Sequence, residues 1–293
     1  MLQEKKVDIG PVALNYVEGP LFGPPLLLLH GIPVRWQEFL PIMPAFCLRW
    51  HLYALDFRGH GKSGRVPGKY HSKFYGQDVI AFLKKRVDKP AILFGMSAGG
   101  LVALDVAAQF PERVRALVLG DSPIDIDWLL AWMSSMEFKA LFSAFRALAG
   151  SKLSIPELAS ELAEVATFVP GEAELMKYGD QPGVDPVSLG QFAMTLSQLD
   201  PGVLEYHAEG RAQEYLEGFD LEEVLARITC PVLLLQGNPS HGGMMTNASV
   251  EYALSKLEIG AHVPIEEYGH DLGLDSWEAG ALLRAVSTFL ESI

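Results

Sequence analysis

The sequence has few cysteines, few basic residues and no long apolar run, and each shortage excludes a class of protein. Only Cys47 and Cys230 occur among 293 residues, too few for a disulfide framework or a metal cluster. Two buried thiols in a reducing compartment are expected instead. No apolar run reaches the roughly 18 residues that a membrane helix requires, and residues 1–6 contain no apolar signal core. We therefore expect a cytoplasmic protein that does not bind membranes.

The shortage of basic residues is confined to one segment of the chain. Lys and Arg number 23 against 36 Asp and Glu, a net charge of −13. Residues 122–226 contain 18 acidic and 5 basic residues, whereas the rest of the chain contains 18 of each. Such a field disfavours nucleic acid and strongly anionic ligands. A solvated acidic surface is the simplest interpretation, and a small-molecule substrate is the expected partner.

The hydrophobic pattern predicts one large α/β domain with an insertion. Apolar strands alternate with amphipathic helices, which is typical of a mostly parallel central sheet flanked by helices. The strands are expected at residues 12–17, 26–29, 52–55, 91–94, 114–119, 232–235 and 262–266. This alternation breaks between residues 122 and 226, where no clear strand is present and several helices are expected. We therefore predict a sheet domain of residues 1–121 and 227–293, interrupted by a helical cap of residues 122–226.

A G-x-S-x-G motif identifies the candidate nucleophile. Gly95-Met96-Ser97-Ala98-Gly99 directly follows an apolar strand and opens a helix, which is the context that a nucleophile elbow requires. The glycines leave room for the tight turn, and the turn lifts the hydroxyl of Ser97 above the edge of the sheet. An ordinary Gly/Ser turn is the alternative, and the position between this strand and this helix argues against it.

A serine hydroxyl needs a neighbouring base, and His270 is the candidate. It lies in Tyr268-Gly269-His270-Asp271, in the loop between the last strand and the terminal helix. The chain order of serine followed by histidine is the one expected for an elbow of this type. None of the other seven histidines has this placement.

Four motifs in this order together resemble the α/β-hydrolase superfamily, and the resemblance covers nearly the whole chain. They are His30-Gly31-Ile32-Pro33, Asp56-Phe57-Arg58-Gly59-His60-Gly61-Lys62-Ser63, the serine elbow and Gly269-His270. The resemblance implies that the backbone N–H groups of Ile32 and Ala98 form an oxyanion hole. It also implies that His30 and the turn at residues 56–63 are architectural.

The third member of the triad departs from the family pattern. Most relatives have an Asp or Glu after the strand that follows the insertion, but here Asn238 stands at that place and no carboxylate occurs between Glu223 and Glu251. Asp121, which ends the strand after the nucleophile, is the best replacement, because some family members place the acid there. A turn or cap role is the alternative for Asp121. Asn238 remains a second candidate as a neutral orienter of His270, whether natural or introduced by substitution.

The sequence favours a serine hydrolase that cleaves a neutral, fairly apolar carboxylic ester or lactone. Aromatic residues of the cap and its surroundings, Trp36, Trp128 and Trp132, are candidates for lining the substrate pocket. No motif requires a cofactor, and His241, Met244 and Met245 lack the spacing of a metal site. A carbon–carbon bond hydrolase or an acyltransferase with the same triad remains open, and so does a non-catalytic ligand-binding sensor. A serine at the elbow argues against dehalogenase and epoxide hydrolase chemistry.

Overall fold

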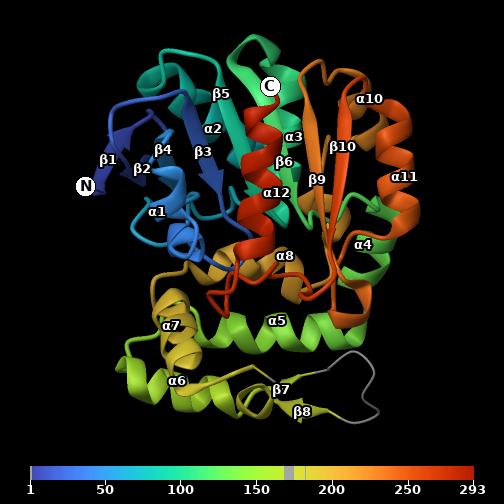
Figure 1. The fold of residues 1–293 in the computed structure, drawn as a ribbon. Coiled ribbons are helices and arrows are strands. Elements are labelled where there is room, and N and C mark those ends of the chain that lie inside the picture. The colour runs from blue at the N-terminus through green and yellow to red at the C-terminus, as the bar shows by residue number, and fades with distance from the viewer. Residues whose placement is uncertain (1, 168–174, 182) are drawn as a thin grey trace.

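The computed structural model describes residues 2–167, 175–181 and 183–293. Its centre is an eight-stranded sheet in the order β1-β2-β4-β3-β5-β6-β9-β10 (Figure 1). The strands are β1 (Gln3–Asp8), β2 (Ala13–Glu18), β3 (Pro25–Leu29), β4 (His51–Leu55), β5 (Ala91–Met96), β6 (Val114–Gly120), β9 (Val232–Gly237) and β10 (Gly260–Ile265). β1 and β4 each pair antiparallel with β2, and all other neighbours are parallel. The predicted α/β fold with a mostly parallel sheet is confirmed.

The sheet is buried on both faces, and its central strands are therefore continuously apolar. Along β3, Leu27 and Leu29 belong to one core, whereas Leu26 and Leu28 belong to the other. This alternation follows from the period of two in strand side chains. The first core is covered by α2 (Ser72–Arg86), α3 (Ala98–Gln109) and α11 (Asn247–Lys256). The second is covered by α1 (Met43–Phe46) and α12 (Gly280–Glu291), with η1 (Trp36–Phe39) beside it.

The turn between β5 and α3 holds Ser97 in a strained backbone conformation. Its φ is 52° and its ψ is −124°, a region that residues other than glycine rarely occupy. The turn is tight because the neighbouring glycines have no side chains. A Cβ on Gly99 would lie 2.1 Å from the carbonyl oxygen of Leu29. The glycine therefore allows β3 to approach the elbow closely.

The segment between β6 and β9 is largely helical and lies across one end of the sheet (Figure 1). Its main helices are α4 (Ile126–Met133), α5 (Met136–Leu148), α6 (Ile155–Ala163) and α7 (Pro186–Ser197), followed by the short η4 (Pro201–Leu204), α8 (Glu205–Ala208) and α9 (Ala212–Tyr215). The expectation of no strand in this segment is wrong, because β7 (Ala166–Thr167) and β8 (Met176–Lys177) form a small antiparallel pair. Two residues per strand are too few to produce a readable alternation.

The last helix of this segment packs with the sheet domain. α10 (Leu221–Ala226) lies beside α11 (Figure 1) and contacts α3 as well. Glu222 of α10 also forms a 2.6 Å ion pair with Lys256 of α11. The buried residues Val224 and Leu225 of α10 join the same core as α3 and α11. The cap boundary at residue 226 remains a prediction.

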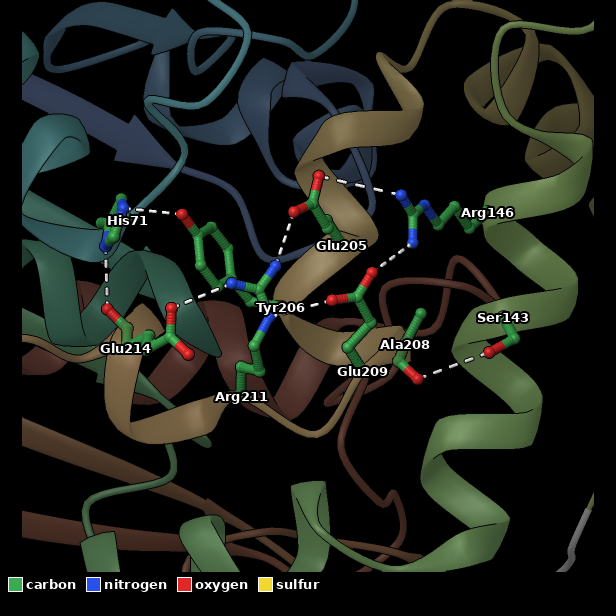
Figure 2. Close-up of polar contacts among 9 residues, drawn as sticks. All are labelled: His71, Ser143, Arg146, Glu205, Tyr206, Ala208, Glu209, Arg211 and Glu214. Atoms are coloured by element: carbon green, nitrogen blue, oxygen red, sulfur yellow. Dashed lines mark hydrogen bonds and ion pairs between the residues drawn. The ribbon is translucent and has the colours of Figure 1, made fainter.

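Hydrogen bonds of His71 attach the cap to the sheet domain. His71, which precedes α2, contacts the hydroxyl of Tyr206 at 2.6 Å and the carbonyl oxygen of Glu214 at 2.8 Å (Figure 2). Within the cap, Arg211 forms ion pairs with Glu205, Glu209 and Glu214 (Figure 2). These ion pairs neutralise part of the excess negative charge of the cap.

Cys47 and Cys230 are free thiols, as expected, but the expectation that both are buried is wrong, because each is only partly buried. No helix in the described ranges is long and apolar enough to span a membrane.

We predict that Gly99→Ala destabilises the protein by at least about 2 kcal/mol, because the new methyl group overlaps a backbone oxygen that cannot move independently. Gly190→Ala is the matched control. That glycine lies within α7, and a Cβ there meets no atom within 4 Å, so the change should be neutral or stabilising by up to about 1 kcal/mol. Urea unfolding followed by circular dichroism measures both. Equal stabilities of the two variants would contradict this account of the elbow.

Candidate active site

The residues after β5, β6 and β10 meet at one edge of the sheet. Parallel strands end at the same edge, so Ser97, Asp121 and His270 lie close together although up to 173 positions separate them. The Nδ1 atom of His270 lies 2.7 Å from Oδ2 of Asp121. The Asp121 side chain is fully buried, whereas the side chain of His270 is 32% exposed. The Nδ1 atom of the imidazole is thus held by a buried carboxylate, while part of the ring remains accessible.

The carboxylate of Asp121 is completely surrounded by hydrogen-bond donors. Its oxygens accept the backbone N–H groups of Gly237 at 3.0 Å, Met244 at 2.6 Å and Met245 at 3.1 Å. A buried carboxylate is costly unless its lone pairs are satisfied, and here three amides and one imidazole satisfy them. The φ of Asp121 is 38°, a left-handed conformation that aspartate tolerates better than most residues.

Ser97 and His270 line the same cavity. Among the described residues, no hydrogen bond joins the hydroxyl of Ser97 to the imidazole in this structure. Such bonds are commonly long or misaligned without substrate and tighten when it binds. The two side chains therefore have the placement, but not yet the contact, of a nucleophile and its base.

The loop after β3 passes close to the elbow, because a Cβ on Gly31 would lie 3.0 Å from the Cβ of Ser97. His30 holds this loop, which contains Ile32, in position. The Nε2 atom of His30 accepts the N–H of Phe57 at 3.0 Å, and its Nδ1–H donates to the carbonyl oxygen of Gly31 at 2.7 Å. Burial lowers the pKa of His30 to about 4, which keeps the ring neutral and suits these two bonds. Ala98 is the first residue of α3, and the first N–H groups of a helix have no acceptor within the helix.

Asn238 lies near this edge, but its side chain is engaged elsewhere. Its Oδ1 accepts the N–H and hydroxyl of Ser240 at 2.9 and 2.7 Å, and its Nδ2 donates to the carbonyl oxygen of Glu266 at 2.8 Å. It therefore caps the turn after β9, and the structure places Asp121 rather than Asn238 against His270. Because β6 and β9 are adjacent, an acid at the end of either strand can reach the same histidine.

The cavity beside Ser97 has a volume of about 520 Å³ and a mixed lining. Its apolar residues include Ile32, Val34, Leu40, Phe192 and Leu274, and its polar ones include Arg35, Glu38, Tyr178, Gln191 and Asp275. Residues of the cap, chiefly from α7, form one wall of it. In the ranges that the structure describes, no group of three His, Cys, Asp or Glu side chains could hold a metal ion.

The three tryptophans expected in the pocket do not line this cavity. Trp36 packs against the second core and donates its indole N–H to Glu4 at 3.4 Å. Trp128 and Trp132 stack on each other within the cap, with ring centroids 5.2 Å apart. They are four positions apart on α4, so they share a face of that helix, and this face packs onto α5 through Phe138. Trp128 and Trp132 therefore belong to the interior of the cap, and Trp36 belongs to the sheet domain.

Two charged residues of the loop after β3 line the cavity without having been predicted. Glu38 accepts the N–H of Gly31 at 3.2 Å, next to the Ile32 amide. Burial raises the pKa of Glu38 to about 8, and the nearby carboxylate of Asp275 adds to the increase. Arg35 is 8% exposed. The only signal for either residue was its position within eight residues of His30.

The raised pKa of Glu38 predicts a stability difference that depends on pH. Between the unfolded pKa near 4.5 and the folded pKa near 8, the unfolded chain releases a proton that the folded chain keeps, so rising pH favours unfolding. Glu38→Gln removes this linkage. We expect the free energy of unfolding of the variant, relative to that of wild type, to increase by about 1–2 kcal/mol from about pH 6 to about pH 8. This increase is smaller than the full linkage would give, because the carboxyl also faces the cavity. Urea unfolding at both pH values measures it, and a gain independent of pH would disprove the assignment.

Comparison with known proteins agrees with this architecture. The family model described as alpha/beta hydrolase fold matches residues 24–276. The chain is 26% identical to 2-(acetamidomethylene)succinate hydrolase of Mesorhizobium japonicum over 98% of this chain and 95% of the relative. It is 27% identical to 3-oxoadipate enol-lactonase 2 of Acinetobacter baylyi over 77% and 75% of the two chains. The crystal structure of an E-2-(acetamidomethylene)succinate hydrolase superposes with a TM-score of 0.72 at 24% identity, covering 99% of this chain and all of that one. The chain therefore belongs to the alpha/beta hydrolase fold family.

Proposed function

We propose that the protein is a serine hydrolase that cleaves a small carboxylic ester or lactone through an acyl-enzyme on Ser97. The observation that carries the proposal is the 2.7 Å contact between Nδ1 of His270 and the buried carboxylate of Asp121. This contact fixes the tautomer that leaves Nε2 free to accept a proton. The strained elbow and the shared cavity support a nucleophilic role for the serine.

In this mechanism Ser97 Oγ attacks the carbonyl carbon while Nε2 of His270 takes the hydroxyl proton. The oxygen of the tetrahedral intermediate accepts the backbone N–H groups of Ile32 and Ala98. The carbon–oxygen bond to the leaving group then breaks, and His270 gives its proton to the departing oxygen. Water repeats the sequence on the acyl-enzyme and regenerates the serine. Asp121 stabilises the imidazolium in both halves without becoming protonated.

The names of the relatives support carbonyl hydrolysis of small substrates. One is a hydrolase of 2-(acetamidomethylene)succinate and another is an enol-lactonase, and the second favours an ester or lactone here. The cavity volume of about 520 Å³ is within the usual range of volumes for small-molecule sites. Carbon–carbon bond hydrolysis and acyl transfer would use the same three side chains, and no contact in the cavity favours them over ester cleavage.

A fluorophosphonate probe should distinguish an enzyme from a binding protein on this fold. We expect wild type to be labelled at one site that peptide mass spectrometry assigns to Ser97, because the probe reacts only with an activated hydroxyl. Ser97→Ala should not be labelled, and His270→Ala should react at least about 10²-fold more slowly, since it lacks the base. A folded wild-type protein that remains unlabelled would favour a ligand-binding sensor and refute the proposal.

The identity of the acid can be tested by exchanging two residues. Asp121→Asn should lower kcat for p-nitrophenyl butyrate by about 10⁴-fold, because the amide cannot neutralise the imidazolium and favours the wrong tautomer. Asn238→Asp should change kcat by less than about 3-fold, since the hydrogen bonds of the Asn238 side chain are to Ser240 and Glu266. Circular dichroism verifies folding of both variants. If Asp121→Asn is active and Asn238→Asp is faster than wild type, the acid has been assigned to the wrong strand.

A further inference from the structure

Arg35 is a buried cation that faces the cavity of Ser97. It lies on the same loop as Ile32, three positions further along the chain, and it is 8% exposed. Its Nε donates to Oγ1 of Thr195 at 3.2 Å, and its Nη1 lies 3.5 Å from Oε1 of Gln198. Both acceptors are neutral. Thr195 lies in the last turn of the cap helix α7, and Gln198 directly follows that helix. A guanidinium has five N–H donors, so these two contacts leave most of its hydrogen-bonding capacity unused.

Arg35 has no counter-charge in contact with it. Among the described residues, no carboxylate oxygen lies within 4.0 Å of its nitrogens. Asp56 and Glu4 act on it only from a greater distance, and the carboxylate of Asp56 is occupied by other donors, including the N–H groups of Trp36 and Lys62.

Arg58 is also buried, but it has a counter-charge in contact with it. Arg58 is 2% exposed, and its guanidinium makes a two-point contact with the carboxylate of Asp78 at 2.7 and 2.5 Å. A buried charge is normally paired, because leaving water without a partner is costly. The unpaired guanidinium in the cavity therefore fits a ligand that supplies the missing carboxylate.

The other charged groups of the cavity favour one orientation of such a ligand. Asp271 directly follows His270 in the chain, and Asp275 lies near enough to both for their charges to act on it. Both aspartates line the same cavity. In the proposed reaction His270 protonates the leaving group, so these two aspartates lie on the side of the cavity from which the leaving group receives its proton. A carboxylate on that side would be repelled, whereas one on the acyl side can reach Arg35.

We propose that Arg35 is a specificity-determining residue that binds a carboxylate on the acyl part of the substrate. The proposal rests on the proposed function and narrows it. Ile32 and Arg35 are three positions apart and line the same cavity, so their Cα atoms are at most roughly 11 Å apart. A short chain between the scissile carbonyl and the carboxylate can span this separation. The acyl group then has the size of a succinyl or glutaryl group. This differs from the neutral, apolar substrate that the composition favoured.

Two esters of equal acyl length test the proposal. Mono-p-nitrophenyl glutarate carries a terminal carboxylate, and p-nitrophenyl valerate has a methyl group at that place. Wild type should have the higher kcat/KM for the glutarate. Arg35→Met should lower kcat/KM for the glutarate by about 10- to 100-fold, mainly through KM, and that for the valerate by less than about 3-fold. Arg35→Lys should keep part of the preference, since it retains the charge but not the fork of donors.

Arg65→Met is the matched control. Arg65 also links the sheet domain to the cap, through a 2.9 Å hydrogen bond to the carbonyl oxygen of Gln198, but it is exposed and does not line the cavity. Its replacement should affect both esters equally. If Arg35→Met also lowers both rates equally, or leaves the glutarate preference intact, Arg35 is only a structural link and the proposal is wrong.

A binding measurement separates this proposal from the proposed function. Calorimetric titration with glutarate requires no catalysis, so it can be read even if wild type hydrolyses neither ester. Binding to wild type and Arg65→Met but not to Arg35→Met supports the carboxylate site. No binding to wild type, or equal binding to Arg35→Met, overturns it. Absence of hydrolysis together with binding that depends on Arg35 would reject the hydrolase alone.

Discussion

The parallel pairing of β5, β6, β9 and β10 brings their carboxyl ends to one edge of the sheet, and the candidate site is built on this edge. Ser97 and Asp121 immediately follow β5 and β6, and both have positive φ values. Two consecutive strands thus end in backbone conformations that are unfavourable for most residues. The close packing of Gly99 against β3 and the hydrogen bonds to the carboxylate of Asp121 hold these turns in place.

Burial separates the electrostatic roles of the histidines and carboxylates. His30 is enclosed and neutral, and it serves the loop that presents the Ile32 amide. His270 has the same side chain but is partly exposed to the cavity and contacts a carboxylate. Asp121 is surrounded by donors, whereas Glu38 accepts one amide N–H, and burial, followed by the nearby carboxylate of Asp275, raises its pKa. Environment, and not residue type, distinguishes the structural groups from those available for chemistry.

The cap forms one wall of the cavity, but few of its aromatic and acidic residues reach it. Its tryptophans pack inside the cap, and its acidic residues are partly paired with Arg146 and Arg211 (Figure 2). The cap residues that line the cavity are Tyr178 and four residues of α7, including Thr195, which accepts a hydrogen bond from Arg35. The overall charge of −13 is therefore a poor guide to the ligand. A buried cation that lines the cavity, such as Arg35, acts on a ligand there at shorter range than a solvated acidic surface.

The sequence by itself determined the α/β class, the family, and the positions of the elbow and of the candidate histidine. These features depend on local patterns: apolar strands, a glycine-flanked serine, and a histidine after the last strand. It left the acid open between Asp121 and Asn238, because a one-dimensional pattern does not record which strand ends are adjacent. Only the tertiary structure shows that Asp121 contacts His270. It also shows that Arg35 and Glu38 line the cavity, whereas Trp36, Trp128 and Trp132 do not. The physical reason is that pocket lining and charge pairing arise from contacts between distant segments, whose side chains carry no periodic signal of their own.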